Sequence, residues 1–158
     1  MSPLITLQRN QDDIQNLLKL ASKLNGKDSS STKKSVLSQA LISTITGFEV
    51  FLRQCYSIYF DFEHVLIGKP LHDTIYPDTR SHFLNLGNAR RKILSLSSID
   101  LKKLVSEEKY KALQLAFPKR HAIVHNVSIK DKEYISQSGE TEESLRESSV
   151  ITSTDVRQ

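Results

Sequence analysis

The sequence predicts an all-α protein that folds as a bundle of about four to five helices. Two observations lead to this prediction. Apolar residues recur at steps of three and four in several segments, which is the spacing of one helix face. Strand signals are weak, because no run of alternating apolar and polar residues is longer than a few positions. A chain of 158 residues fits one domain with one core.

The first helix is predicted over residues 14–24. Its apolar positions follow helical steps, and Asp12 and Asp13 precede it, where helix starts favour acidic residues. Gly26 follows as a stop signal. The serine-rich stretch GKDSSSTKK, residues 26–34, is therefore predicted to be a solvated linker.

A second and longer helix is predicted over residues 37–59, because one apolar stripe continues there for about six turns. The stripe consists of Leu37, Leu41, Ile45, Phe48, Leu52, Cys55 and Tyr59. This helix should be the centre of the core. Glu49 and Arg53 lie one turn apart beside the stripe. They are predicted to form a surface ion pair that contributes about 0.3 kcal/mol to stability.

The stretch IGKPLHDTIYPDT, residues 67–79, contains one glycine and two prolines and is predicted to be a connecting loop. Apolar spacing resumes over residues 83–96 and predicts a further helix. The outer face of this helix carries Arg90, Arg91 and Lys92. These three side chains are either an RNA contact or an ordinary solvated face.

The second half of the chain also contains residues that predict where helices begin and end. Asp100 is predicted to cap the segment LKKL, and Ser106 to open a helix that runs to Phe117. Pro118 should interrupt that helix. After it, the stretch SIKDKEYISQSG predicts one more short helix that Gly139 closes.

The helical domain is expected to span residues 1–138. Residues 139–158 are polar and low in aromatics, which predicts a mobile tail, and the final TSTDVRQ resembles the start of a truncated further element. The formal net charge is +4, and five acids against two arginines in the tail leave the excess of positive charge on the domain. A basic balance of this size weakly favours partners that carry phosphate.

The sequence predicts a cytoplasmic protein. It shows neither an uninterrupted apolar run near the roughly 18 residues that a membrane span needs nor a basic and then apolar N-terminus typical of a secretory signal. Cys55 is the single cysteine, so the chain cannot form an intramolecular disulfide. Its apolar flanks predict a buried thiol rather than a nucleophile.

The stretch FPKRHAIVHN, residues 117–126, holds the candidate functional residues. His121 and His125 should lie one turn apart on one helix face, with Ile123 and Val127 on the opposite, core-facing side. Arg120 stands about 140° around the axis from His125. The two groups can therefore meet at one small target in either of two ways. In the first, Arg120 would lie in a distorted first turn after Pro118, where free N–H groups also attract phosphate. In the second, two such motifs would meet across a two-fold axis.

The chemistry that suits these groups is phosphodiester cleavage. Histidine titrates near neutrality, so it can take a proton from a ribose 2′-hydroxyl or give one to the leaving 5′-oxygen. Arginine stays charged and offers planar donors to the phosphate oxygens as negative charge builds. This reaction requires neither a metal nor another cofactor.

Three other interpretations remain open. Two histidines four apart can hold zinc, although the residues between them include no glutamate and no third ligand is evident nearby. In a structural role, Arg120 would pair with an acid and His125 would form a hydrogen bond within the core. Nucleophilic catalysis would need Cys55 beside His125, for which the sequence gives no reason.

Arg120, the polar His121, three further residues and His125 together resemble the Arg-X4-6-His signature of the HEPN domains. The longer string RHAIVHNVSIKDKEY is similar to the HEPN subgroup in which RHxxVHN is followed by an acid and a tyrosine, here Asp131 and Tyr134. The segment FEVFLRQ of the long helix resembles an aromatic and acidic segment of the same subgroup. Val127 occupies the position of a regulatory tyrosine found in a different subgroup.

The resemblance implies an all-α, metal-independent endoribonuclease that acts as a toxin or antiviral defence effector. It implies a homodimer whose two motifs line one cleft, with RNA as substrate and an antitoxin or other defence protein as a further partner. His125 would be the general acid and base, and Arg120 would bind the phosphate in the transition state. His121, Asn126 and Lys119 would support the motif or bind RNA, and the products would carry 2′,3′-cyclic phosphate ends. The alternative is a non-catalytic HEPN module that binds RNA, dimerises or assembles with a partner.

Overall fold

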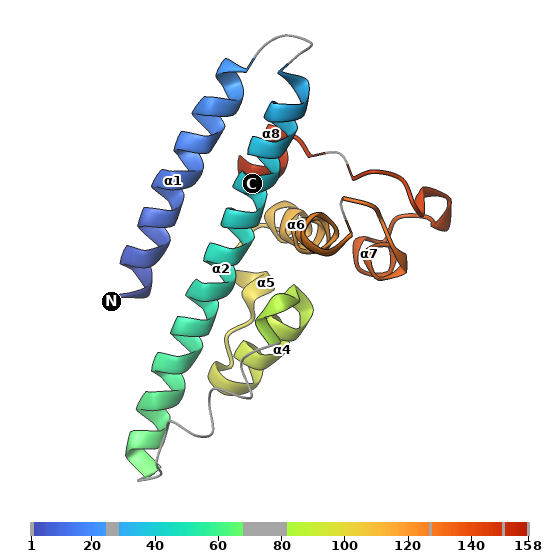
Figure 1. Ribbon diagram of the computed structural model, residues 1–158. Helices are drawn as coiled ribbons and strands as arrows, with labels where there is room; N and C mark the ends of the chain where they lie inside the picture. The colour runs from blue at the N-terminus through green and yellow to red at the C-terminus, as the bar shows by residue number, and fades with distance from the viewer. Residues whose placement is uncertain (1, 25–28, 68–81, 127, 150, 158) are drawn as a thin grey trace.

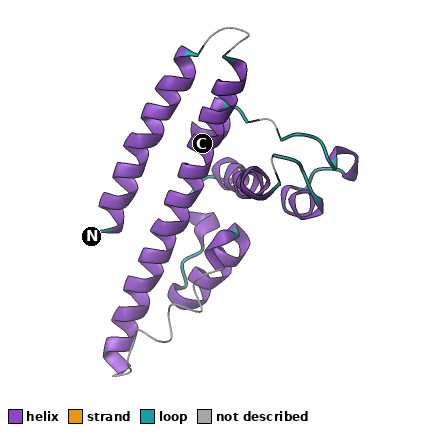
Figure 2. Ribbon diagram, viewed as in Figure 1, coloured by secondary structure: helices purple, strands orange, loops and turns teal. Residues whose placement is uncertain are grey.

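The computed structural model describes residues 2–24, 29–67, 82–126, 128–149 and 151–157. Within these ranges the chain is helical apart from turns and one isolated antiparallel bridge, so the predicted all-α class is confirmed (Figure 2). The α-helices are α1 (Pro3–Lys23), α2 (Ser30–Ile67), α4 (Leu86–Ser97), α5 (Leu101–Leu104), α6 (Glu107–His125), α7 (Lys132–Ser138) and α8 (Ser153–Arg157). Two short 3-10 turns complete them, η1 (His82–Leu84) and η2 (Glu142–Ser144).

Helices α1 and α2 form an antiparallel pair along one side of the molecule (Figure 1). Both are longer than predicted. Helix α1 begins at Pro3 because proline is tolerated in the first turn, where its missing N–H would have no partner within the helix. Helix α2 begins at Ser30, inside the predicted linker, and residues 25–28 lie outside the described ranges. The two helices approach closely at Gly47, where the side-chain amide of Asn10 donates a hydrogen bond to the Ser43 carbonyl over 3.1 Å.

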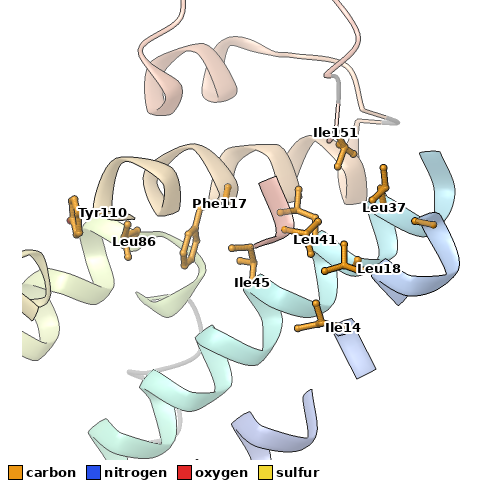
Figure 3. Packing of buried hydrophobic residues seen from close by; sticks show 13 residues of the cluster. Ile14, Leu18, Leu37, Leu41, Ile45, Leu86, Tyr110, Phe117 and Ile151 are labelled. Carbon is orange, nitrogen blue, oxygen red and sulfur yellow. The ribbon is translucent and has the colours of Figure 1, made fainter. Parts of the chain in front are cut away.

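The core has two parts, and α2 contributes to both. The larger part joins α1, α2, α6 and the C-terminal segment (Figure 3). It consists of Ile14, Leu18, Ala21, Leu37, Ala40, Leu41, Ile45, Leu86, Tyr110, Ala116, Phe117, Ile151 and Val156. The smaller part, where α4 and η1 pack against α2, consists of Leu52, Tyr56, Phe83 and Ala89. The long α2 is therefore the centre of the core, as its apolar stripe predicts.

Two predicted helix starts and one predicted stop are confirmed. Asp100 caps α5 by accepting from the Lys102 amide, and the Ser106 hydroxyl accepts from the Lys109 amide at the start of α6. Gly139 ends α7 at a φ of 74°, a left-handed conformation that glycine adopts at little cost. The predicted loop at residues 67–79 lies, beyond Ile67, outside the described residues.

Pro118 does not interrupt α6, so this prediction is wrong. The helix runs from Glu107 to His125 with Pro118 inside it. Proline cannot donate a hydrogen bond to the carbonyl four residues earlier, which costs about 3 kcal/mol in an exposed helix. Here the ring is among the fully buried side chains, next to the buried Ala116 and Phe117. Burial of this apolar segment offsets the missing hydrogen bond.

The segment after α7 packs onto the domain, in contrast to the tail that its polar composition predicts. Residues 128–130 and 146–149 are joined by backbone hydrogen bonds, including Lys130 N to Glu147 O at 3.0 Å and Ser149 N to Ser128 O at 2.7 Å. Beyond them, Ile151 and Val156 are buried in the larger core, and α8 packs against α2. The domain therefore includes residues on both sides of the expected boundary at 138.

Within the described residues, one helical stretch, Ser30–Phe60 of α2, is long and apolar enough by length and composition to cross a membrane. The central helix of a compact core passes the same test. Leu41 and Ile45 of this stretch are buried against other helices of the protein, as are other residues on its inner face.

Candidate active site

The last turns of α6 carry the two histidines of the motif. The ring centroids of His121 and His125 lie 4.7 Å apart, with the ring planes tilted by 42°. Residues four apart on a helix are neighbours on one face, so this contact follows directly from the spacing. His125 is exposed and His121 is partly exposed. The predicted placement of the two rings on one helix face is confirmed.

Arg120 contacts a different element. Its Nη2 lies 4.0 Å from Oε2 of Glu49 on α2, and its side chain is 18% exposed. Because α6 is continuous at Pro118, Arg120 and His125 keep the separation of about 140° around the axis of a regular helix. A distorted first turn at Pro118, with free N–H groups for phosphate, is not formed. The site in one chain is thus a histidine pair and a separate arginine.

Glu49 is buried, so the predicted surface pair with Arg53 is wrong. The residue is 3% exposed. Burial raises the pKa of its carboxyl group, while the charges of Arg120 and Arg53 act in the opposite direction. In the part of the chain that the structure describes, Oε1 of Glu49 and Nε of both arginines are buried without a hydrogen-bond partner. The buried carboxylate of Glu49 is therefore influenced by two arginines, Arg120 on α6 and Arg53 one turn further along α2.

The sequence contains a signal that would have placed Glu49 correctly. It comes four residues after Ile45 and three before Leu52, and both of these are buried. This is the spacing of the apolar stripe itself. Glu49 is therefore a charged residue inside the buried face of α2 rather than beside it.

The segment that follows α6 places one acidic residue beside His121 and fixes the end of the helix. Oε2 of Glu133 on α7 lies 3.7 Å from Nε2 of His121. Asn126, which ends α6, donates from its side chain to Asp131, and Asp131 caps α7 by accepting from the Tyr134 amide over 2.7 Å. That amide hydrogen bond, followed by the one from Asn126, lowers the pKa of Asp131. Asn126 is thus tied to the α7 start rather than directed at His125.

The remaining predicted basic contacts are engaged elsewhere. Lys119 forms an ion pair with Asp155 at the start of α8, where both side chains are mostly buried. Arg90 donates two hydrogen bonds to Asp100, from Nε over 2.6 Å and from Nη2 over 2.7 Å. Lys92 Nζ lies 5.9 Å from the ring centre of Tyr56. Lys119 therefore does not join the histidines in this chain.

Cys55 belongs to another part of the molecule. It is half-buried and lines a small apolar hollow between α2 and α4, together with Tyr56 and Ile93. Burial raises the pKa of its thiol, which favours the protonated, unreactive form. Among the described residues, no group of three or more His, Cys, Asp or Glu side chains lies close enough together to hold a metal ion.

Known proteins give no further guide to this arrangement. No protein-family model, curated protein or solved structure matches the chain. The chemistry must therefore be argued from the groups themselves. Two adjacent imidazoles can accept and donate protons, and a guanidinium can bind a phosphate oxygen.

Proposed function

We propose that the protein is a metal-independent endoribonuclease of the HEPN class that acts in the cytoplasm as a toxin or antiviral defence effector. The observation that carries the proposal is the pair of the exposed His125 and the partly exposed His121 on one face of α6. Arg120, whose Nε has no hydrogen-bond partner among the described residues, lies on a different face of the same helix. Its partners would be RNA, a second copy of the chain and an antitoxin or other defence protein.

The proposed reaction is a transfer within the RNA strand. One imidazole takes the proton of the ribose 2′-hydroxyl, and the 2′-oxygen then forms a bond to phosphorus. The bond from phosphorus to the 5′-oxygen breaks, and that oxygen receives a proton from the other imidazole. The products are a 2′,3′-cyclic phosphate and a 5′-hydroxyl. The two imidazoles are proposed to be the more exposed rings, the His125 side chains of the two copies in a dimer, one acting as base and the other as acid. Arg120 binds the phosphate oxygens that gain charge.

A homodimer is part of the proposal because of the geometry of α6. Arg120 and His125 of one chain face directions about 140° apart, so they do not converge on one phosphate. Two copies related by a two-fold axis would bring the arginine of one motif to the histidines of the other. The exposed end of α6 leaves the imidazoles available for such a contact.

The test is cleavage of single-stranded RNA and tRNA by the purified protein in excess EDTA, with the end groups mapped. We expect cyclic phosphate ends from the wild type and a loss of at least about 100-fold in His125→Ala, the size of a general acid–base contribution. The matched control is Gln114→Ala, which removes an exposed side chain from the same helix. Cleavage that survives in His125→Ala would contradict the proposal. Cleavage that the wild type shows without EDTA but loses in excess EDTA would contradict it as well.

One observation favours the second candidate, a non-catalytic HEPN module that binds RNA or a partner protein. Arg120 lies against the buried Glu49 and Asn126 is bound to Asp131, so both side chains already have structural partners. A module of this kind would form a dimer and bind RNA without cutting it. Analytical ultracentrifugation together with RNA binding at low salt separates the two candidates, because a folded dimer that binds RNA and leaves it intact identifies the module.

A further inference from the structure

Arg53 is the least explained charged group in the core. It lies on α2 one turn after Glu49, and its Nε is buried with no hydrogen-bond partner in the described ranges, although the side chain is not fully enclosed. Burying part of a guanidinium without a partner for its donors is costly. A bound ligand or a role in the site would explain why Arg53 occupies this costly position.

The charges around Glu49 do not balance. One buried carboxylate faces two guanidinium groups, Arg53 from its own helix and Arg120 from α6. With Glu49 ionised, the cluster keeps one positive charge, and the Nε donors of both arginines remain unused within the described part of the chain. Because these two Nε atoms are closed to solvent, a ligand would reach the cluster through the partly exposed remainder of the two arginine side chains, whose excess positive charge suits a tetrahedral oxyanion.

We propose that Arg53 is a second phosphate-binding residue, held next to Arg120 by Glu49, so that the two arginines receive one backbone phosphate of single-stranded RNA. The choice of ligand rests on the function proposed above, while the cluster itself depends only on its charges and unused donors. Glu49 acts as the positioning residue, because its carboxylate lies 4.0 Å from Nη2 of Arg120 and one helical turn before Arg53 without touching the phosphate.

The experiment measures binding rather than cleavage. The probe is a fluorescein-labelled 2′-O-methyl oligoribonucleotide, which has the RNA backbone but no 2′-hydroxyl to react. Arg53→Gln should weaken its binding about tenfold and reduce the salt dependence of the affinity by about one phosphate contact. Glu49→Gln removes the balancing negative charge, so it should tighten binding several-fold. A purely structural role would not move the two variants in opposite directions.

The matched control is Arg9→Gln, which removes an exposed arginine from α1 and should change the affinity less than twofold. Arg53→Lys keeps the charge and loses the planar donors, so it should bind between the wild type and Arg53→Gln. If Arg53→Gln unfolds at the assay temperature, this milder variant decides the matter. Equal weakening in Arg9→Gln, unchanged binding in Arg53→Lys, or weaker binding in Glu49→Gln overturns the proposal.

The outcome is separable from that of the cleavage test. Loss of binding in Arg53→Gln with no cleavage of ordinary RNA by the wild type would retain the phosphate site and reject the ribonuclease. Cleavage by the wild type with unchanged probe binding in Arg53→Gln would retain the ribonuclease and reject the second arginine.

Discussion

The contact between Arg120 and Glu49 predicts that replacing Arg120 affects stability as well as activity. Arg120→Ala leaves the carboxylate of Glu49, which is 3% exposed, with Arg53 as the remaining positive charge that acts on it. Two unit charges 4.0 Å apart attract by about 4 kcal/mol at an effective dielectric constant of about 20. Arg53 and protonation of Glu49 offset part of the loss. We therefore expect the free energy of unfolding to fall by about 2 kcal/mol.

A double-mutant cycle isolates this interaction. The free energy of unfolding is measured by urea titration with circular dichroism for the wild type, Arg120→Ala, Glu49→Gln and the double variant. The coupling energy should be about 1–3 kcal/mol at neutral pH and should decline on acidification, because protonation of Glu49 removes the attraction. The control is the exposed pair of Lys111 and Glu107 on the same helix, whose coupling should stay near about 0.3 kcal/mol.

A coupling energy within about 0.5 kcal/mol of zero for Glu49 and Arg120 would refute the electrostatic account of the cluster. The result also decides how the cleavage test is read. If Arg120→Ala is destabilised as expected, Arg120→Lys is the better variant for judging phosphate binding, because it keeps a charge beside Glu49 while losing the planar donors.

Three further predictions concern the fold. Ile151→Ala should lower the free energy of unfolding by about 2–3 kcal/mol, because the side chain is buried in the main core. Gly47→Ala should cost about 1 kcal/mol, since the new methyl group would meet the Asn10 amide at 2.0 Å and displace its hydrogen bond. Asp100→Asn keeps a helix cap but loses the charge that Arg90 holds. Because that contact lowers the pKa of Asp100 from 3.8 to about 2, the stability it provides should be present at neutral pH and lost as the pH falls through this interval.

Each of these predictions has a control in urea unfolding. Leu104→Ala removes an exposed apolar side chain, 65% exposed, and should change stability by less than about 0.5 kcal/mol. An equally small effect of Ile151→Ala would mean that the segment does not pack on the core. Asn10→Ala should cancel most of the additional cost of Gly47→Ala, and a simple sum of the two effects would count against the clash. For Asp100→Asn, a deficit relative to wild type that persists at pH 2 would argue against the ion pair.

The helices were predictable from sequence because apolar spacing and capping residues are local signals. The start of α6 at Ser106 and the end of α7 at Gly139 depend on side chains within a few residues of each boundary. The pairing of His121 and His125 was predictable for the same reason, since it needs only the helical repeat.

The features that were missed depend on contacts between distant segments. Pro118 signals a helix end by itself, and only the buried surroundings that the fold provides allow α6 to continue through it. The segment from 139 onward is polar on average, and its packing relies on two apolar anchors, Ile151 and Val156. The partner of Arg120 was missed because Glu49 was assigned to a surface position beside the apolar stripe, although its spacing places it on the buried face of α2, which contacts α6.

The position of Ile151 and Val156 in the main core also bears on how the chain acquires its structure. They complete a cluster whose other members come largely from α1 and α2, at the opposite end of the described sequence. Contacts of such long sequence separation close a large loop and form late in folding. The pair of α1 and α2 can assemble early from local contacts, but the part of its apolar face that Ile151 and Val156 cover stays exposed until the C-terminal segment arrives. Translation of the segment around Ile151 is therefore the step after which the newly made chain can bury that face.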